Sequence, residues 1–204
     1  MIVLTADQVD SRSTPDLVGT AVRDLNGNPQ LRLVLPAERT AGDEIQLVPA
    51  SGVDALAVIL QLTRTGRWSV GCGVGPIREP LPASVRESAG EAFIAARHAV
   101  ERAKKRPTRF ALDTEPAGEG AQDVEALLDL LLVLRDRRSD EGWQLHDLLV
   151  TGMMQAEAAS ALGISPQAAS KRAQAAELRA EEAVIPALAR LIDDLDRGNE
   201  KTSS

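Results

Sequence analysis

Two adjacent carboxylates follow a glycine at Gly42-Asp43-Glu44, between two runs of apolar residues. Such a triplet is most often the tip of a hairpin, where Gly and Asp supply the turn geometry and both acids face water. A further acid, Asp7, ends the first apolar run of the chain. If the strand ending at Asp7 lies beside the strand that begins near Ile45, Asp7 and Asp43 project from one end of a sheet. Carboxylate oxygens bind Mg²⁺ or Mn²⁺, and these ions in turn hold triphosphates. The sequence therefore supports two interpretations here, a plain hairpin and a metal site at Asp7 and Asp43.

Three stretches carry a resemblance to a known family. They are Asp7 with Ser11 and Arg12, Gly42-Asp43-Glu44 with Gln46, and residues 70–75 (VGCGVG) with residues 90–97 (GEAFIAAR). In this order they resemble the SatD-like family, which is similar to the catalytic domain of class III nucleotidyl cyclases and diguanylate cyclases. Residues 39–45 have the register of the diguanylate cyclase signature, with Ala41 replacing its first glycine. The resemblance covers about residues 1–105. It implies a cyclase-like, ferredoxin-like sheet that binds a nucleotide effector through Arg39, Glu44 and Arg97, with Mg²⁺ or Mn²⁺ as cofactor.

The chain departs from the cyclases at the groups that would complete catalysis. The cyclases carry an Asn and an Arg on the helix after the last core strand, and these groups stabilise the transferring phosphoryl group. Here Phe93-Ile94-Ala95 occupies the place of the Asn, which leaves Arg97 as the counterpart of the Arg. We therefore assign no catalytic residue. We expect nucleotide or metal binding without turnover, or a purely structural or dimerising domain, with a nucleotidyl cyclase or related phosphoryl-transfer enzyme as the alternative.

A second constellation lies at residues 151–180 and has the pattern of a helix-turn-helix. Thr151 is a candidate N-cap, and Met154, Ala158 and Leu162 share one face of the first helix. Gly163 supplies the left-handed residue that ends a helix. Ser165-Pro166 then starts the second helix, with a capping side chain followed by proline at the first helical position.

The second helix of this unit offers the polar side chains that read DNA. The residues expected to face outward are Gln167, Ser170, Lys171, Arg172 and Gln174. Gln pairs with adenine edges, and Lys contacts guanine or phosphate. The unit resembles the helix-turn-helix of sigma-factor region 4 and of MarR-type regulators, although an ordinary helical hairpin has a similar pattern. Residues 151–185 carry three basic and four acidic side chains, so we expect a homodimer that combines two weakly binding units on DNA.

The elements that position these residues alternate between strand and helix up to residue 112. The expected strands are residues 2–4, 31–35, 45–48, 68–75 and 109–112, and the expected helices begin at residues 14 and 51 and cover residues 88–105. The order indicates an α+β fold whose sheet has helices on one face. The glycines within residues 68–75 indicate a strand that another element approaches closely.

Residues 113–121 (DTEPAGEGA) interrupt the apolar periodicity on both sides, and we predict that they form a linker. We therefore expect an α+β domain at residues 1–112 and an all-helical domain at residues 122–204. The apolar stripe Leu188–Leu195 on the last helix packs either on its own domain or across a dimer.

Composition and charge limit the possible partners and location of the protein. The chain has 204 residues and a net charge of −7. Residues 1–112 hold 14 basic and 12 acidic residues, whereas residues 113–204 hold 9 and 18, which argues against nonspecific nucleic-acid binding by the second half. A single cysteine, Cys72, and the lack of a signal peptide or a membrane-spanning run indicate a cytoplasmic protein.

Two smaller groups of residues are interpreted as structural. The basic residues Arg102, Lys104, Lys105, Arg106 and Arg109 follow a long helix and are expected to stabilise its C-terminus. His98 and His146 are expected to be ordinary helix residues without acidic partners. The leading hypothesis is a dimeric, DNA-binding transcriptional regulator with a degenerate cyclase-like sensor or dimerisation domain.

Overall fold

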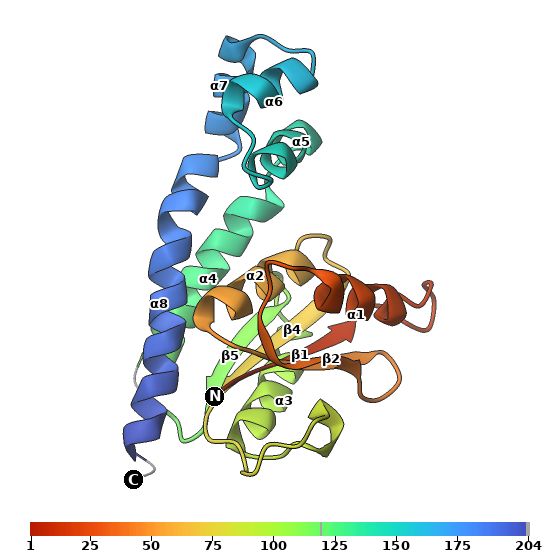
Figure 1. Cartoon of the computed structure of the whole chain (residues 1–204), viewed down its shortest axis with the longest axis vertical. Coiled ribbons are helices and arrows are strands. Elements are labelled where there is room, and N and C mark those ends of the chain that lie inside the picture. The colour runs from red at the N-terminus through yellow and green to blue at the C-terminus, as the bar shows by residue number, and fades with distance from the viewer. Residues whose placement is uncertain (119, 203–204) are drawn as a thin grey trace.

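The computed structural model describes residues 1–118 and 120–202, and the fold is mixed α and β (Figure 1). The strands are β1 (Ile2–Gln8), β2 (Leu33–Arg39), β3 (Glu44–Pro49), β4 (Trp68–Val74) and β5 (Phe110–Thr114). They form one sheet in the order β2-β3-β1-β4-β5. The pairs β2–β3, β3–β1 and β1–β4 are antiparallel, and β5 joins β4 in parallel at the edge. The strand order along the chain agrees with the sequence-based prediction.

The helices of the described chain are α1 (Val18–Gly27), α2 (Gly52–Thr63), α3 (Glu91–Ala103), α4 (Ala121–Asp136), α5 (Asp140–Leu149), α6 (Gln155–Ala161), α7 (Pro166–Ala175) and α8 (Leu178–Thr202), with a short 3-10 helix at Val85–Glu87. None of the helices in residues 1–118 and 120–202 combines the length and apolar character needed to cross a membrane.

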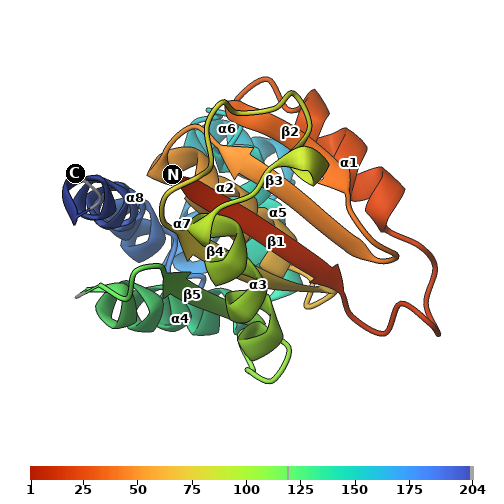
Figure 2. The ribbon, with the colours of Figure 1, turned by 90° about the horizontal axis from the view of Figure 1, so that it is seen from below.

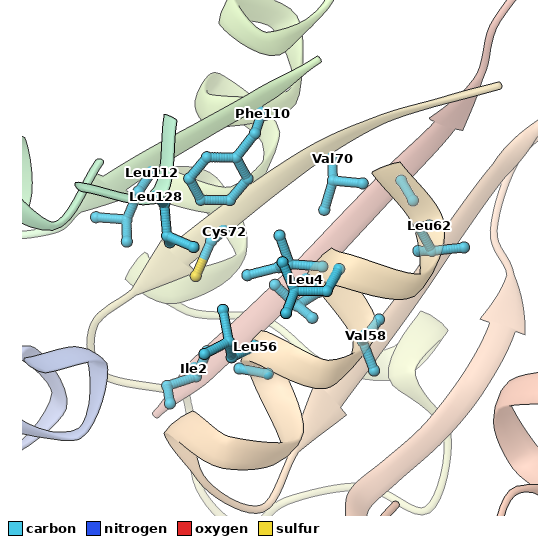
Figure 3. Close-up of a cluster of buried hydrophobic side chains, with 14 of the residues drawn as sticks. Ile2, Leu4, Leu56, Val58, Leu62, Val70, Cys72, Phe110, Leu112 and Leu128 are labelled. Carbon is cyan, nitrogen blue, oxygen red and sulfur yellow. The ribbon is translucent and has the colours of Figure 1, made fainter. Parts of the chain in front are cut away.

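Strand β4 lies at the centre of the packing and shows a strict alternation. Val70, Cys72 and Val74 point to the face that packs with α2, where Leu4 and Leu56 complete the main core (Figure 3). Ser69, Gly71 and Gly73 alternate with them and therefore face the opposite side. That side is covered by α3. Helices thus lie on both faces of the sheet, so the expected one-sided arrangement is wrong.

The two glycines of β4 determine how closely α3 approaches. A Cβ atom at Gly71 would lie 2.3 Å from the backbone nitrogen of Val100, and one at Gly73 would lie 2.2 Å from the carbonyl oxygen of Ala92. Contacts this short do not occur between real side chains and backbone, so only glycine permits α3 to lie against β4. The close approach predicted from the glycine-rich strand is confirmed.

Helices α4 and α8 belong to the same core as the sheet. Leu128 of α4 and Leu188 and Ile192 of α8 are fully buried in the cluster that contains Leu4 and Leu56. Figure 2 shows α4 along the β5 edge and α8 beside it. Apolar contacts therefore cross the boundary expected at residues 113–121. Of the stripe Leu188–Leu195, Leu188, Ile192 and Leu195 pack on this core, whereas Leu191 is 37% exposed.

Helices α5, α6 and α7 form a small unit of their own, which we call the head. Its interior is Leu145 of α5, Ala158 of α6 and Ala173 of α7. Figure 1 shows the head beyond the end of the sheet, at the far end of α4 and α8. Helix α4 leads from the main core into the head, and helix α8 returns from the head to the main core.

Several expected boundaries shift for local reasons. The first helix begins at Val18, because the Asp16 carboxylate accepts a hydrogen bond from the Val18 N–H at 2.9 Å. Strand β2 runs from residue 33 to 39 and includes Pro36, with irregular register against β3. The linker is shorter than expected, because Asp113 and Thr114 complete β5 and Ala121 begins α4.

Candidate nucleic-acid interface and acidic hairpin

Gly42 and Asp43 lie in the turn between β2 and β3, as the hairpin interpretation predicted, and Glu44 is the first residue of β3. Gly42 has a φ of +56°, a conformation in which glycine is favoured. Thr40 donates from its hydroxyl to Glu44 at 2.5 Å and closes the turn. In the β1–β3 register Asp7 lies directly opposite Glu44. The backbone oxygen of Asp43 accepts from the Gln8 N–H at 3.1 Å, which ties the turn to the end of β1.

Asp7 and Glu44 already have cationic partners from the α3 side of the sheet. The Lys104 ammonium lies 3.0 Å from the Asp7 carboxylate, and the Arg97 guanidinium lies 3.3 Å from Glu44. Burial raises the pKa of Asp7 above its ordinary value; Lys104 opposes this shift, and the charges of Asp43 and Glu44 add to it. Lys104, one of the basic residues interpreted as a helix cap, therefore pairs with Asp7 at the end of β1, beside the hairpin.

Asp43 faces a different environment from Asp7. Its carboxylate accepts a hydrogen bond from the Ser11 hydroxyl. Arg39 forms an ion pair with Asp16 on this same side of the sheet. An open pocket of about 350 Å³ is lined by Gln8, Ser11, Arg12, Asp16, Arg39, Gly42 and Asp43. The predicted nucleotide-binding residues are thus divided between this pocket, which holds Arg39, and the α3 side, which holds Glu44 and Arg97.

The ion pairs bear directly on the expected metal site at Asp7 and Asp43. Within residues 1–118 and 120–202, no three His, Cys, Asp or Glu side chains are grouped so that they could hold a metal ion. A divalent ion at Asp7 would compete with the Lys104 ammonium for the same carboxylate. A metal here would therefore need oxygen ligands from the nucleotide itself or from water.

The head places α6 and α7 around a tight turn. Gly163 has a φ of +64°. Its N–H donates to the backbone oxygen of Ser160 at 3.1 Å, and the Ile164 N–H donates to the backbone oxygen of Ala159 at 3.0 Å. This is the Schellman pattern that ends a helix. The Ser165 hydroxyl then accepts from the Ala168 N–H at 3.1 Å, with Pro166 at the first position of α7. The predicted turn and cap are confirmed.

The start of α6 differs from the prediction. Thr151 is not its N-cap, because residues 151 and 152 form a turn in which the Thr151 hydroxyl donates to the backbone oxygen of Leu148 at 2.7 Å. The helix begins after Met154, whose N–H donates to the Glu157 carboxylate at 2.9 Å. The Met154 side chain is 70% exposed and does not share the inward face. Ala158 and Ala159 provide that face.

Helix α7 divides cleanly into an inward and an outward face. Ala169 and Ala173 are buried. The predicted DNA-contacting residues are Gln167, Ser170, Lys171 and Gln174, which are exposed, and Arg172, which is half-buried. Ser170 and Gln174 also line a groove of about 420 Å³, together with residues that include Gln155 and Arg179. The structure therefore gathers four of the five predicted residues on one accessible face.

A cluster that the sequence did not predict lies where the head meets the main core. The buried Glu181 carboxylate of α8 pairs with Arg135 of α4 and with Arg138, which lies between α4 and α5. The guanidinium carbons of Arg64, Arg138 and Arg135 lie 4.2, 4.4 and 4.7 Å from the centroid of the Trp143 ring. We call the set Arg64, Arg135, Arg138, Trp143, His146, Asp147 and Glu181 the arginine junction.

His146 is part of this junction, so the expectation that it has no acidic partner is wrong. Its Nδ1 lies 3.2 Å from Asp147, and its Nε2 lies 3.7 Å from Glu181. Burial lowers the pKa of His146; Asp147 opposes this shift, and the charges of Arg135 and Arg138 reinforce it. Burial and the nearby cations both favour the neutral imidazole.

Helical periodicity in the sequence contained a signal for the junction. Arg135 lies three and four residues after the buried Leu132 and Leu131, on the apolar face of α4. Glu181 lies seven residues before Leu188 on the stripe of α8 that faces the core. A charged residue on an apolar stripe is almost never fully buried without a partner. Two opposite charges on two such stripes therefore indicate a buried pair.

Comparison of the chain with protein-family models, with curated proteins and with solved structures finds no match.

Proposed function

We propose that the protein is a DNA-binding transcriptional regulator in which α6 and α7 act as a helix-turn-helix and α7 enters the major groove. The observation that carries this proposal is the outward face of α7. Within the described part of the chain, the side chains of Gln167, Ser170, Lys171 and Gln174 form no hydrogen bond or ion pair. In contrast, Arg102 and Arg106 of the sheet domain bind the α4 carboxylate Glu125.

Position supports the same proposal. The head is the part of the molecule farthest from the sheet, so a duplex can approach α7 without meeting the sheet domain (Figure 1). The N-terminal half of a recognition helix contacts the base edges. Gln167 and Ser170 lie in that half of α7, and Lys171 follows directly after it. Gln167 and Lys171, four residues apart, fall on one side of the helix.

Charge indicates that one head binds weakly. Lys171, Arg172 and Arg179 are the basic residues near α7, and Glu177 and Glu157 lie close to them in the sequence. Because phosphate neutralisation supplies most of the nonspecific affinity, a single head gains little from the DNA backbone. We therefore propose a homodimer that places two α7 helices about one helical turn of DNA apart.

DNA binding by the full chain tests the proposal. Selection from fragmented genomic DNA at low salt yields the preferred sites, and fluorescence anisotropy gives their affinities. We expect Gln167→Ala/Lys171→Ala to weaken specific binding at least tenfold, because a good base contact contributes roughly 1–3 kcal/mol. Loss of Lys171 also reduces the salt dependence of log K by about 0.9 if that side chain binds a phosphate.

The control is Lys105→Ala/Gln30→Ala, which removes the same two residue types from exposed positions outside the head. This variant should bind like the unchanged protein. Equal binding by both double variants would remove α7 as the recognition helix. No binding to any fragment at low salt would reject the regulator.

A second candidate function, binding of a nucleotide with Mg²⁺ or Mn²⁺, is favoured by the sheet domain. The strands β2-β3-β1-β4 alternate in direction, and α1 and α2 share one face, which is the arrangement expected of a ferredoxin-like, cyclase-like domain. The Asp43 pocket adjoins the hairpin turn, and Arg12 and Arg39 line it. These features support a degenerate sensor that holds a triphosphate against Asp43.

Isothermal titration of GTP and ATP in the presence of Mn²⁺ tests this second candidate. Binding lost in Asp43→Ala and in Arg39→Gln, but retained in Asp24→Ala, would support a nucleotide site at the hairpin. Turnover of either nucleotide would instead favour the phosphoryl-transfer enzyme. Absence of binding at millimolar nucleotide would leave the hairpin as a structural turn.

A further inference from the structure

A small cavity of about 90 Å³ lies between the main core and the head. The charged and aromatic residues that line it are Arg64, Arg109, Arg135, Asp136 and Trp143. They come from the end of α2, the start of β5, the end of α4 and α5, so four parts of the chain meet there. One water needs roughly 10–15 Å³ of such space, so the cavity is large enough for a small polyatomic ion. It is far below the roughly 300–1,000 Å³ of a typical ligand pocket.

The charges around the cavity do not balance. Arg64 makes two hydrogen bonds of 2.8 Å to Asp147, while Arg135 and Arg138 share the single carboxylate of Glu181. The junction therefore holds three guanidiniums and two carboxylates. At the cavity wall, the positive charge of Arg109 and the negative charge of the exposed Asp136 cancel. One positive charge remains, beside a buried Arg135 and a partly exposed pair of Arg64 and Asp147.

Two guanidinium groups also have unused donors. Within the described residues, the buried Nε of Arg135 and the buried Nη1 of Arg138 have no hydrogen-bond partner, and of these two residues Arg135 lines the cavity. The Arg135 side chain is only 7% exposed. Burial lowers the pKa of Arg135 to about 10, and the charges of Arg138 and Arg64 contribute. Arg135 thus stays cationic at neutral pH, beside like charges and with a donor unsatisfied. Buried groups in this state are costly unless a partner is supplied.

We propose that this cavity binds one tetrahedral oxyanion, either free phosphate or the phosphoryl group of a small phosphate monoester. The oxyanion supplies the missing negative charge and accepts hydrogen bonds from guanidinium groups, which match its geometry. The size of the cavity admits the phosphoryl group alone and leaves any attached ester group outside. Chloride would supply charge without the several acceptor oxygens that separate guanidiniums require.

The binding site has a regulatory consequence, and this part rests on the proposed DNA-binding function. Arg138 donates from Nε to the backbone oxygen of Ala176, at the end of α7, at 3.1 Å. Arg135 donates to the backbone oxygen of Leu60 in α2 at 3.2 Å. An oxyanion at Arg135 competes with Glu181 for the same guanidinium, so it changes the contact between the main core and the segment that follows α7. The bound oxyanion thereby sets the orientation of the head.

Isothermal titration of the full chain with inorganic phosphate and with methyl phosphate tests the site, at constant ionic strength set by sodium chloride. We expect saturable binding of phosphate, and a tenfold or greater loss in Arg109→Gln, which removes a cation from the cavity wall. Arg137→Gln removes an exposed neighbouring charge that does not line the cavity, and it should change the affinity less than twofold. Binding of phosphate alone identifies the free ion as ligand, and binding of both identifies a phosphoryl group.

Fluorescence provides a second readout. Trp143 lines the cavity, whereas the other tryptophan, Trp68, is buried in the main core. Phosphate should change the emission of the unchanged protein but not that of Trp143→Phe. No saturable binding, or equal affinity in Arg109→Gln and the unchanged protein, would reject the site.

DNA affinity measured with and without phosphate separates the two proposals. Phosphate binding without any DNA binding rejects the regulator and leaves the oxyanion site intact. DNA binding without phosphate binding rejects the oxyanion site and leaves the regulator intact. If both bind, we expect phosphate to change the DNA dissociation constant at least fivefold, as allosteric couplings commonly do. An unchanged constant would reject the coupling.

Discussion

Glu181 of α8 contacts three side chains of the arginine junction. Its two oxygens pair with Arg135 and Arg138, and His146 lies 3.7 Å away. A buried ion pair contributes little by itself, because desolvation offsets the attraction. Removing one partner is costly, however, because it leaves a buried charge without compensation.

We therefore expect Glu181→Gln to lower the free energy of unfolding by roughly 3–5 kcal/mol. Urea denaturation followed by circular dichroism measures this change. The control is Asp194→Asn, which breaks the exposed pair between Asp194 and Arg197 on the same helix. Exposed pairs contribute about 0–1 kcal/mol. Equal losses in the two variants would show that the junction does not carry the stability assigned to it.

His146 gives the stability of the protein a pH dependence near neutrality. Its pKa in the folded protein lies below the ordinary value of 6.5, so the unfolded chain binds the proton more tightly. The stabilisation is present above pH 6.5 and is lost as pH falls below it. The urea concentration at the midpoint of unfolding should decrease in the unchanged protein as pH is lowered from 8 to 5. This decrease should be smaller in His146→Gln, and parallel curves would assign the effect to other groups.

At the scale of elements, the contact between α3 and β4 is set by glycine. Gly73 lies against the backbone of Ala92 and Ala96, and Gly71 lies against Ala96 and Val100. The alanines of α3 and the glycines of β4 together allow the helix to approach the sheet closely. The same α3 carries Arg97 and leads into Lys104, the partners of Glu44 and Asp7. The packing of α3 therefore also positions the cations of the hairpin.

We expect Gly73→Ala to destabilise the fold by about 3 kcal/mol, the upper end of typical overpacking costs. The reason is that the added Cβ meets the α3 backbone and not a flexible side chain. Gly27→Ala is the control, because a Cβ at Gly27 meets no atom within 4 Å. Thermal unfolding of the two variants measures the difference. A neutral Gly73→Ala would mean that α3 can move away from β4 without loss.

At the scale of the whole molecule, α4 and α8 unite the sheet and the head. Asp193 of α8 accepts a hydrogen bond from the Gly52 N–H, at the start of α2, at 2.5 Å. Leu128, Leu188 and Ile192 fill the core on the same face of the sheet. A fragment that ends at residue 112 loses these groups and exposes Leu56 and its neighbours.

We therefore expect residues 1–112 to be unfolded or aggregated when expressed alone, as judged by circular dichroism and by amide NMR dispersion. A chain in which residues 140–176 are replaced by a short Gly-Ser loop keeps α4 and α8 and should fold. Well-dispersed spectra for residues 1–112 would instead support the domain boundary expected from the sequence.

Much of the local structure could be predicted from the sequence, because it depends on neighbours along the chain. Gly42 and Gly163 were predicted at turns for the conformation that glycine favours, and both have positive φ. Ser165-Pro166 was predicted as a helix start from its capping chemistry. The alternation of β4 and its glycines also predicted a closely approached strand. Each of these features is a property of residues a few positions apart.

The arginine junction, the cavity and the partners of the hairpin acids were decided only by tertiary structure. Glu181 meets Arg135 and Arg138 across more than 40 sequence positions. Lys104 reaches Asp7 from the opposite end of the sheet domain in sequence. Ion pairs of this kind depend on how whole helices pack, and many arrangements share the same hydrophobic periodicity. Local sequence thus specified which elements form, whereas long-range packing decided which charges meet.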